Sequence, residues 1–274
     1  MWNDTLLDSV VNIALAAGQE ILAVYNQAGD IAVSTKADDS PLTEADRRAH
    51  TLIVEQLITL DNQIPVLSEE SESVSSKERN SWERYWLVDP LDGTKEFVKR
   101  NGEFTVNIAL IEKGQATLGV VHVPVLDTTY VGKLGLGAWK SSKAGIKQIK
   151  CSSIESPTQL IRVVASRSHR GELVDDLLQL IKERFGETEV VSMGSSLKIC
   201  LLAEGAADIY PRLAPTCEWD TAAAHAVVAA AGGEIVDTNF QTLRYNQKKE
   251  LLNPHFIGIA DVNYDWKSLL DTSN

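Results

Sequence analysis

Apolar side chains recur at helical spacing in the first quarter of the chain, which predicts two amphipathic helices. The first covers residues 4–26 and the second covers residues 44–60. A short strand is expected between them, at 31–36. Thr43 followed by Asp46 resembles a capping box in which aspartate replaces the usual glutamate or glutamine, so the second helix should begin there.

The pattern then changes to short apolar runs that are typical of strands. Residues 85–88 predict a buried strand that stops at Asp89-Pro90. Three β-like runs follow at 104–112, 116–124 and 127–132, and they predict an antiparallel meander.

Strands alternate with helices from about residue 150 onward, which is typical of α/β packing. The predicted strands are 161–165, 188–192, 206–210, 234–237 and 256–260, and the predicted helices are 171–184, 196–204, 220–231 and 263–270. We therefore expect an N-terminal α+β half, 1–150, and a C-terminal α/β half, 151–274. No flexible linker marks the boundary, so the two halves should share a broad interface.

Composition narrows the classes of function. The chain has 274 residues, of which 44% are apolar and 23% charged, as in an ordinary globular protein. The formal net charge of −12 disfavours binding to nucleic acid polymers, because phosphate-backbone affinity comes from lysine and arginine. A small phosphorylated ligand remains compatible with this charge if metal ions screen the carboxylates.

The chain carries no sign of export or of membrane insertion. Three cysteines without metal-thiolate spacing fit a reducing compartment. The N-terminus lacks a basic segment typical of secretory signals, and no uncharged apolar stretch approaches the ~20 residues of a membrane span. We expect a cytoplasmic protein, and leave open both peripheral contact with the cytoplasmic face of the inner membrane and the oligomeric state.

The most specific motif follows the strand at 85–88. Its six residues are Asp89, Pro90, Leu91, Asp92, Gly93 and Thr94. Proline lacks an N–H and glycine tolerates positive φ, so a tight turn here can aim two carboxylates and a freed carbonyl at one point. Such an all-oxygen site suits Mg²⁺ or Mn²⁺. The alternative is a simple Asp-Pro turn with a hairpin signal at Asp92-Gly93, but this explains neither Asp89 nor Thr94.

Three further acidic positions have both a structural and a functional interpretation. Glu69 and Glu70 follow an apolar run and could simply be a solvated strand end. Asp220 lies in the first turn of a small-residue helix, where the helix dipole favours an anion. Asp46 could serve only its cap, or could accept a hydrogen bond from a catalytic hydroxyl.

Taken together, these motifs resemble the inositol monophosphatase superfamily of magnesium-dependent phosphomonoesterases. That family shows an acid pair, then Asp-Pro-(Ile/Leu)-Asp-Gly-Thr, then Trp-Asp with a small-residue helix, and all three occur here in this order. The closer similarity is to its bacterial bisphosphate nucleotidase branch. The segments that carry it are 36–43, 65–70, 85–97, 101–110, 166–169, 194–198 and 210–212, and Ser68 agrees with this branch, where the wider family commonly has glycine.

The resemblance implies a layered α-β-α-β-α sandwich that binds two or three Mg²⁺ ions, with Mn²⁺ as a substitute. One ion would be held by Glu69, Asp89 and the Leu91 carbonyl, and a second by Asp89, Asp92 and Asp220, while Glu69, or Glu70 through water, would bind a weaker third. The implied catalytic residues are Asp46, Thr94 and Glu70. The residues implied to contact substrate are Glu69, Leu91, Asp92, Gly93, Thr94, His169, Ser195, Lys198, Arg212 and Asp220.

The implied reaction is hydrolysis of adenosine 3',5'-bisphosphate to AMP, with 3'-phosphoadenylyl sulfate as a further substrate, in sulfate assimilation. Inhibition by Li⁺ is typical of the superfamily. Two alternatives remain open at this point. One is an inositol phosphate or sugar phosphatase with the same metal core, and the other is a catalytically silent metal-dependent binding protein.

Overall fold

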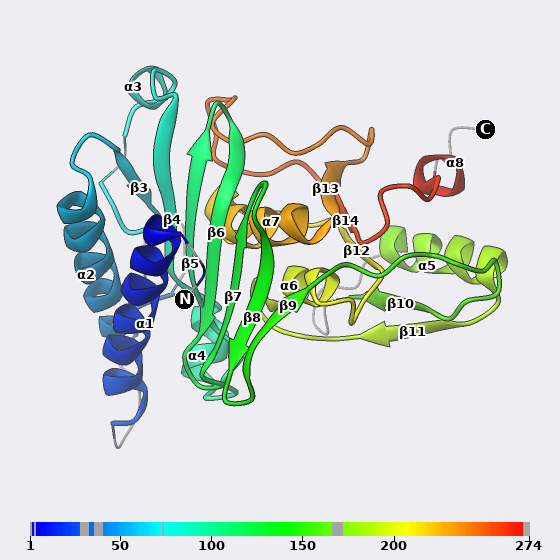
Figure 1. The fold of residues 1–274 in the computed structure, drawn as a ribbon, viewed down its shortest axis with the longest axis horizontal. Coiled ribbons are helices and arrows are strands. Elements are labelled where there is room, and N and C mark those ends of the chain that lie inside the picture. The colour runs from blue at the N-terminus through cyan, green and yellow to red at the C-terminus, as the bar shows by residue number, and fades with distance from the viewer. Residues whose placement is uncertain are drawn as a thin grey trace.

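Five layers follow one another along the molecule: a helix pair, a seven-stranded sheet, a second helix pair, a five-stranded sheet and a third helix pair (Figure 1). The computed structural model describes residues 2, 4–27, 33–35, 41–72, 74–165 and 172–270. The α-β-α-β-α sandwich predicted from the sequence is confirmed.

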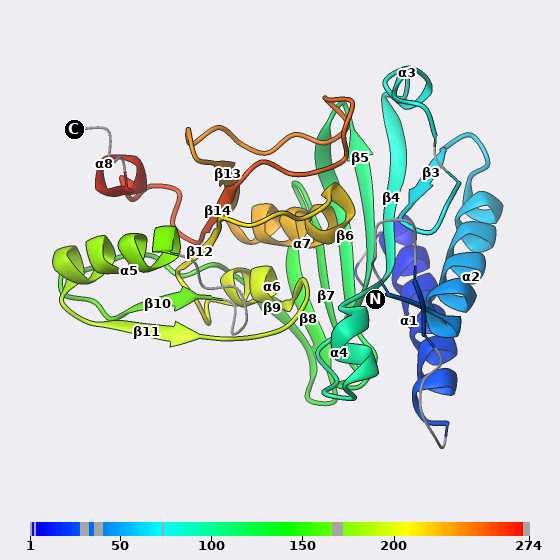
Figure 2. The ribbon, with the colours of Figure 1, turned by 180° about the vertical axis from the view of Figure 1, so that it is seen from behind.

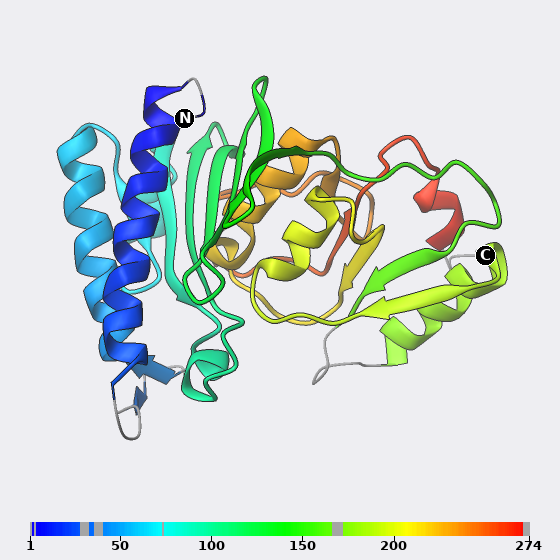
Figure 3. The ribbon, with the colours of Figure 1, turned by 60° about the horizontal axis from the view of Figure 1, so that its bottom comes forward.

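The outer helix layer consists of α1 (Thr5–Tyr25) and α2 (Glu44–Leu60), which lie side by side on one face of the large sheet (Figure 3). The predicted capping box at Thr43 and Asp46 is present and starts α2 at the expected residue. Ahead of it, β1 (Val33–Thr35) pairs with β2 (Pro41–Thr43). By length and composition α1 could cross a membrane, but half of its apolar window is buried inside the molecule. Its packing against α2 and the sheet accounts for its apolar character.

The seven-stranded sheet follows chain order, with β3 parallel to β4 and every later pair antiparallel. Its strands are β3 (Val66–Ser68), β4 (Arg84–Asp92), β5 (Thr105–Glu112), β6 (Gln115–Val123), β7 (Thr128–Lys133), β8 (Gly137–Ser142) and β9 (Gly145–Ile149). The predicted meander is confirmed and is longer than expected, because β8 and β9 add a hairpin in a stretch where glycines hid the strand pattern. Two short helices, α3 (Ser76–Arg79) and α4 (Thr94–Val98), precede and follow β4 (Figure 2).

The central layer contains α6 (Leu197–Ala203) and α7 (Glu218–Ala231), which separate the two sheets (Figure 2). Close approach of α7 to the large sheet depends on two glycines. A Cβ added at Gly119 would lie 2.0 Å from the Ala223 carbonyl oxygen, and one at Gly132 would lie 2.5 Å from Val227 Cα. Both positions therefore exclude any side chain, and the N-terminal turn of α7 is brought toward the large sheet.

The five-stranded sheet has the order β11-β10-β12-β14-β13 and is covered on its outer side by α5 (Glu172–Phe185) and α8 (Trp266–Leu270). Its strands are β10 (Ile161–Val164), β11 (Thr188–Val191), β12 (Ile209–Arg212), β13 (Glu234–Asp237) and β14 (Phe256–Ile259). One hydrophobic core lies between the two sheets and takes residues from both sides of position 150. The two-half division therefore stays a prediction, with a shared core at its boundary.

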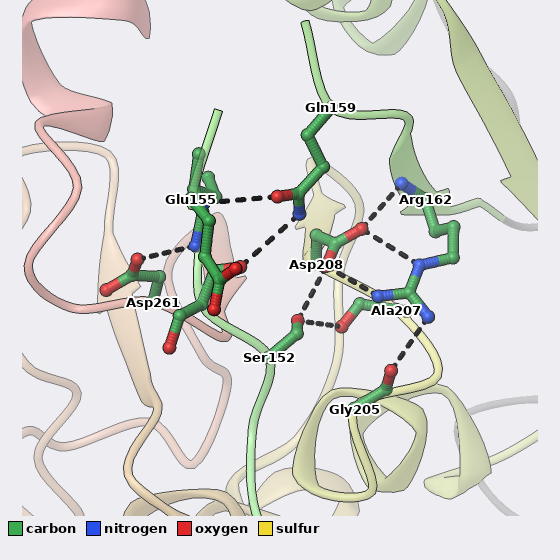
Figure 4. A network of polar contacts seen from close by, with 10 residues as sticks. Ser152, Glu155, Gln159, Arg162, Gly205, Ala207, Asp208 and Asp261 are labelled. Atoms are coloured by element: carbon green, nitrogen blue, oxygen red, sulfur yellow. Dashed lines mark hydrogen bonds and ion pairs between the residues drawn. The ribbon is translucent and has the colours of Figure 1, made fainter. Parts of the chain in front are cut away.

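A polar network ties the segment after β9 to this second sheet (Figure 4). Arg162 on β10 donates to both carboxylate oxygens of Asp208, which is buried, and to the Gly205 carbonyl. Ser152 donates to the same carboxylate at 2.6 Å. These bonds hold the crossing segment against β10 and β12, where the second half of the chain begins.

Candidate active site

The motif after residue 88 is a bulge in a strand, which corrects the expectation that the strand stops at Asp89. In β4, Asp89 pairs with Asn107 and Asp92 pairs with Thr105, so two residues of β4 face one residue of β5. Pro90 has no N–H to donate to the ladder, and a bulge is where a sheet tolerates it. The bulge turns the ladder locally and leaves both aspartates at the carboxyl end of β4, where a bulge commonly re-aims side chains.

Gly93 makes the connection from this bulge to α4. Its φ is +91°, and a Cβ there would lie 3.2 Å from the Glu103 carbonyl oxygen. A side chain at this position would be strained and crowded. Glycine therefore allows the chain to turn sharply from Asp92 into α4 and keeps two loops in contact.

Four acids from three elements come together at this point. Asp89 is 1% exposed, and its burial raises the pKa of its carboxyl well above the usual value. The negative charges of Glu69, Asp92 and Asp220 raise this pKa as well, by a smaller amount. Asp89 also shares a hydrogen bond with Glu69, which lies at the end of β3. The tertiary structure therefore brings Glu69, the bulge in β4 and the first turn of α7 together.

The other two aspartates of this cluster, Asp92 and Asp220, are partly buried. Burial, and after it the charge of Asp92, raises the pKa of Asp220 to about 8. Burial also raises the pKa of Asp92, and hydrogen bonds from Ser196 together with the charge of Lys198 oppose that rise. Repulsion between buried carboxylates is reduced by a proton or by a cation, and a cation keeps every oxygen available as a ligand.

A divalent cation fits this donor set by its chemistry, since carboxylate and carbonyl oxygens are the ligands of Mg²⁺ and Mn²⁺. Among the described residues no three histidine, cysteine, aspartate or glutamate side chains are arranged to hold an ion as they lie. The acids are thus gathered at one place without a completed coordination sphere. A site of this kind would complete its geometry when the ion binds.

Ser196, which the sequence analysis did not single out, links Asp92 on β4 to Asp220 on α7 by hydrogen bonds. Its N–H donates to Asp92 Oδ2 at 2.6 Å, and its hydroxyl lies 2.8 Å from both that oxygen and the Asp220 carbonyl. Asn107 on β5 donates to the same hydroxyl at 2.8 Å. The only available signal was its place beside Ser195 in the segment that resembles the family.

Asp46 and Thr94 lie beside each other. Thr94 Oγ1 is 3.5 Å from Asp46 Oδ1 and 3.4 Å from the Leu91 carbonyl. The other oxygen of Asp46 accepts from the hydroxyl and the N–H of Thr43, at 2.5 and 2.7 Å. The capping and functional interpretations of Asp46 are compatible, because each uses a different carboxylate oxygen.

A cavity of about 520 Å³ opens beside the acids. Its lining includes Asp92, Gly93 and Asp220 together with Ser195, Lys198 and Arg212 from the second half of the chain. Six of the residues predicted to contact substrate therefore share one cavity. Leu91 lies on β4 and Thr94 begins α4, whereas Glu69 and Glu70 follow β3 and Glu69 lines a separate cavity beside Trp219. His169 lies outside the described residues.

The cationic wall of this cavity has unused donors. Within the part of the chain that the structure describes, the Nε of Arg212 is buried with no hydrogen-bond partner, while its Nη2 donates to the Pro215 carbonyl at 3.3 Å. Burial lowers the pKa of Lys198; the charge of Asp92 opposes this, and Arg212 lowers it further. Two neighbouring cations with a free donor favour an anionic ligand group between them. Ser195 stands beside them in a left-handed conformation, with φ of +43°.

Two more lysines in the cavity lining were missed by the sequence analysis. Lys95 and Lys99 are exposed, lie four residues apart on α4 and its C-cap, and both face the cavity. Their i, i+4 spacing on one helix face was a usable signal. They provide positive charge at the outer rim, opposite the second half of the chain.

Comparison with known proteins identifies the class to which this site belongs. The sequence profile of the inositol monophosphatase family matches residues 2–266. The chain belongs to the inositol monophosphatase family, and the resemblance found from its motifs is confirmed.

Particular relatives narrow the comparison. The chain is 50% identical over 251 residues to the 3'(2'),5'-bisphosphate nucleotidase CysQ of Salmonella typhimurium, an alignment that covers 92% of this chain and 98% of the relative. It is 38% identical to the CysQ of Haemophilus influenzae, covering 97% of each chain. The crystal structure of CysQ from Bacteroides thetaiotaomicron superposes with a TM-score of 0.82 at 42% identity, covering 94% of this chain and 98% of that one. A suhB structure from Bartonella henselae, at 22% identity and a TM-score of 0.78 over 99% and 100% of the two chains, shares the fold.

Proposed function

We propose that this chain is a divalent-metal-dependent phosphomonoesterase that converts adenosine 3',5'-bisphosphate to AMP and phosphate. The observation that carries the proposal is the shared cavity, in which Asp92 and Asp220 of the acid cluster adjoin the two cationic side chains Lys198 and Arg212. A substrate with two phosphates fits such a cavity, because one phosphate can meet the metal end and the other the cationic wall. The names of the CysQ relatives support the same substrate class.

The metal end would be formed by the residues that the sequence motifs pointed to. One ion is assigned to Glu69, Asp89 and the Leu91 carbonyl, a second to Asp89, Asp92 and Asp220, and a weaker third to Glu69 or to Glu70 through water. When bound, Mg²⁺ ions supply charge stabilisation and lower the pKa of water, which phosphate monoester hydrolysis needs because the uncatalysed reaction is very slow. Mn²⁺ would substitute, and Li⁺ would inhibit.

The protein groups around this end would orient the reactants. Asp46 accepts a hydrogen bond through the oxygen that faces Thr94, so the pair can hold a water molecule by its proton and direct its lone pair toward phosphorus. The N–H groups of Gly93 and Thr94 can donate to phosphate oxygens, since the first N–H groups of a helix lack intrahelical partners. No protein nucleophile is needed, and Glu70 would assist through water.

The cationic wall would select the substrate. Lys198 and Arg212 would bind the second phosphate together with Ser195 and with His169, which lies outside the described residues. Arg212 Nε offers a donor that has no partner among the described residues. The rim lysines Lys95 and Lys99 would favour substrates with further negative charge, such as 3'-phosphoadenylyl sulfate. We assign this activity to sulfate assimilation in the cytoplasm; no observation in the described residues supports the peripheral membrane contact left open above.

A substrate panel tests the proposal. Phosphate release is measured with Mg²⁺, and again with chelator, from adenosine 3',5'-bisphosphate, inositol 1-phosphate and fructose 1,6-bisphosphate. We expect the nucleotide to have the highest kcat/KM and chelator to abolish turnover. Equal or better turnover of inositol 1-phosphate would replace the nucleotide assignment by the inositol phosphatase alternative. No Mg²⁺-dependent release from any substrate would favour the silent binding protein.

A further inference from the structure

His50 makes a hydrogen bond that the proposed mechanism does not use. Its Nδ1 lies 2.9 Å from the hydroxyl of Ser68, which is 3% exposed at the end of β3. His50 is on α2, one helical turn after Asp46. The next residue after Ser68 is Glu69, so this bond reaches the acid pair from the helix layer.

The backbone around Ser68 is already fixed on its sheet side. Ser68 pairs with Val88 in the parallel β3–β4 ladder, and the N–H of Glu69 donates to the Val88 carbonyl at 3.0 Å. The Ser71 N–H donates to the Ser68 carbonyl at 3.0 Å, which turns the chain directly after the strand. The histidine bond adds a connection on the opposite side of this turn, from α2.

Asp46 and His50 are four residues apart, so they lie on the same face of α2. The first contacts Thr94 beyond the bulge, and the second contacts Ser68 beside the acid pair. The helix α2 therefore contacts the surroundings of the acid cluster at two places, at Thr94 and at Ser68. A small shift of α2 would displace the water-orienting carboxylate and the acid pair together.

We propose that His50 and Ser68 are a positioning pair that holds the Glu69–Glu70 segment in register with Asp46, so that α2 sets the relative place of the metal-binding acids and of the group that orients water. The inference rests on the proposed function for its catalytic consequence, but its structural consequence concerns cation binding alone. Neither residue needs to touch substrate or metal to have this effect.

The chemistry of the pair suits such a role. Burial lowers the pKa of His50, so its ring is neutral near neutral pH and adds no positive charge beside a cation site. A neutral imidazole and a hydroxyl can each donate or accept, so the bond forms in either tautomer. Second-layer hydrogen bonds of this kind fix the orientation of acids that bind metal.

The experiment compares His50→Ala, Ser68→Ala, the double variant, and His50→Gln, whose amide can still bond to the hydroxyl. Mn²⁺ binding is measured without substrate by electron paramagnetic resonance, and kcat and KM are measured with Mg²⁺. Losing one neutral hydrogen bond should weaken Mn²⁺ binding about 3- to 10-fold in either single variant. The double variant should be no weaker than the singles, KM for the nucleotide should change less than about twofold, and His50→Gln should restore binding in part.

The matched control is His255→Ala, because His255 is exposed and lies away from the acids. The thermal unfolding temperature of each variant shows whether weaker Mn²⁺ binding comes from a destabilised fold or from a displaced Glu69–Glu70 segment in a folded protein. Unchanged Mn²⁺ binding in both single variants overturns the proposal, as do additive effects in the double variant. Wild-type protein that binds Mn²⁺ but fails to hydrolyse the nucleotide refutes the proposed function and leaves the pair to be judged on binding, whereas absence of Mn²⁺ binding in the wild type refutes both.

Discussion

The acidic end of the site, formed by Glu69, Asp89, Asp92 and Asp220, and its cationic wall, formed by Lys198 and Arg212, are built from different parts of the chain and in different ways. The acids are short side chains at the ends of β3 and β4 and in the first turn of α7, and backbone bonds hold several of them in place. The cations Lys198 and Arg212 are long side chains on α6 and β12, and the Nε of Arg212 has no hydrogen-bond partner among the described residues. Short acids held by backbone hydrogen bonds suit the binding of a cation, whereas long cationic side chains suit recognition of a phosphate.

This difference has an energetic side. The acidic end collects like charges that raise one another's pKa around the buried Asp89, so it is electrostatically unfavourable until a cation or a proton binds. At the cationic wall, repulsion between Lys198 and Arg212 is likewise unfavourable, since the charge of Arg212 lowers the pKa of Lys198. Both ends are prepared for partners of opposite charge, which is the general way in which a site trades folding stability for binding.

The largest expected effect is at the acidic end. Asp92→Asn keeps the acceptor for Ser196 but removes one negative charge from the cluster. A catalytic metal supplies several kcal/mol of transition-state stabilisation, so kcat should fall on the order of 10³-fold. Phosphate release with Mg²⁺ measures this, and Asp176→Asn on the exposed face of α5 is the matched control. More than a tenth of wild-type kcat in Asp92→Asn would remove this residue from the metal site.

The next largest effect is expected at Asp46 and Thr94, the pair proposed to orient water. Thr94→Ala removes the hydroxyl that faces Asp46, and loss of such positioned proton transfer costs on the order of 10² in rate. We expect the loss in kcat with little change in KM, and recovery in Thr94→Ser. A change confined to KM would instead assign the hydroxyl to substrate binding.

At the cationic wall the effect should be smaller and selective. Lys198→Ala removes one charge-assisted hydrogen bond, which is worth about 1.5–3 kcal/mol, so kcat/KM for the bisphosphate should fall about 10- to 100-fold, mainly through KM. A nucleoside 3'-monophosphate should be affected much less. Lys182→Ala, at an exposed position on α5, serves as the control. Equal losses for both substrates would show that Lys198 does not contact the second phosphate.

The smallest expected effect is a pH dependence of stability that belongs to the acidic end alone. Burial, and then the charge of Asp92, raises the pKa of Asp220 to about 8 from an ordinary value of 3.8. Between these values the metal-free folded protein binds a proton that the unfolded chain has released, so its free energy of unfolding should fall as pH rises. Mg²⁺ should oppose this fall.

Urea unfolding in chelator at about pH 5.5, 6.5 and 7.5 measures this slope, and repetition with Mg²⁺ tests its origin. Asp220→Asn, which removes the titrating group, should flatten the slope. If stability instead rises with pH over this range in chelator, the buried acids are not the source of the dependence.

Local patterns determined much of what the sequence analysis obtained correctly. The helix at 44–60 and the strand at 234–237 were predicted with the bounds that the structure shows, because periodicity and a capping box act over a few residues. The bulge in β4 was missed, since an aspartate next to proline is also typical of a strand end. Only pairing with Asn107 and Thr105 shows that the ladder continues.

The roles of Ser196 and His50 could not be found in the same way. Each is an ordinary polar residue whose importance comes from a partner 104 or 18 positions away along the chain. Nothing in the neighbouring sequence distinguishes such a residue from an exposed serine or histidine. Their contacts appear only when the layers are packed together.

The sequence by itself determined the elements, the acidic motifs and the family, because each of these is written in short runs of adjacent residues. Tertiary structure decided that Asp220 meets Asp89 and that Lys198 and Arg212 share their cavity. The physical reason is close packing: α7 reaches the large sheet only where Gly119 and Gly132 leave no side chain between them, and that approach brings acids and cations from distant parts of the chain to one place.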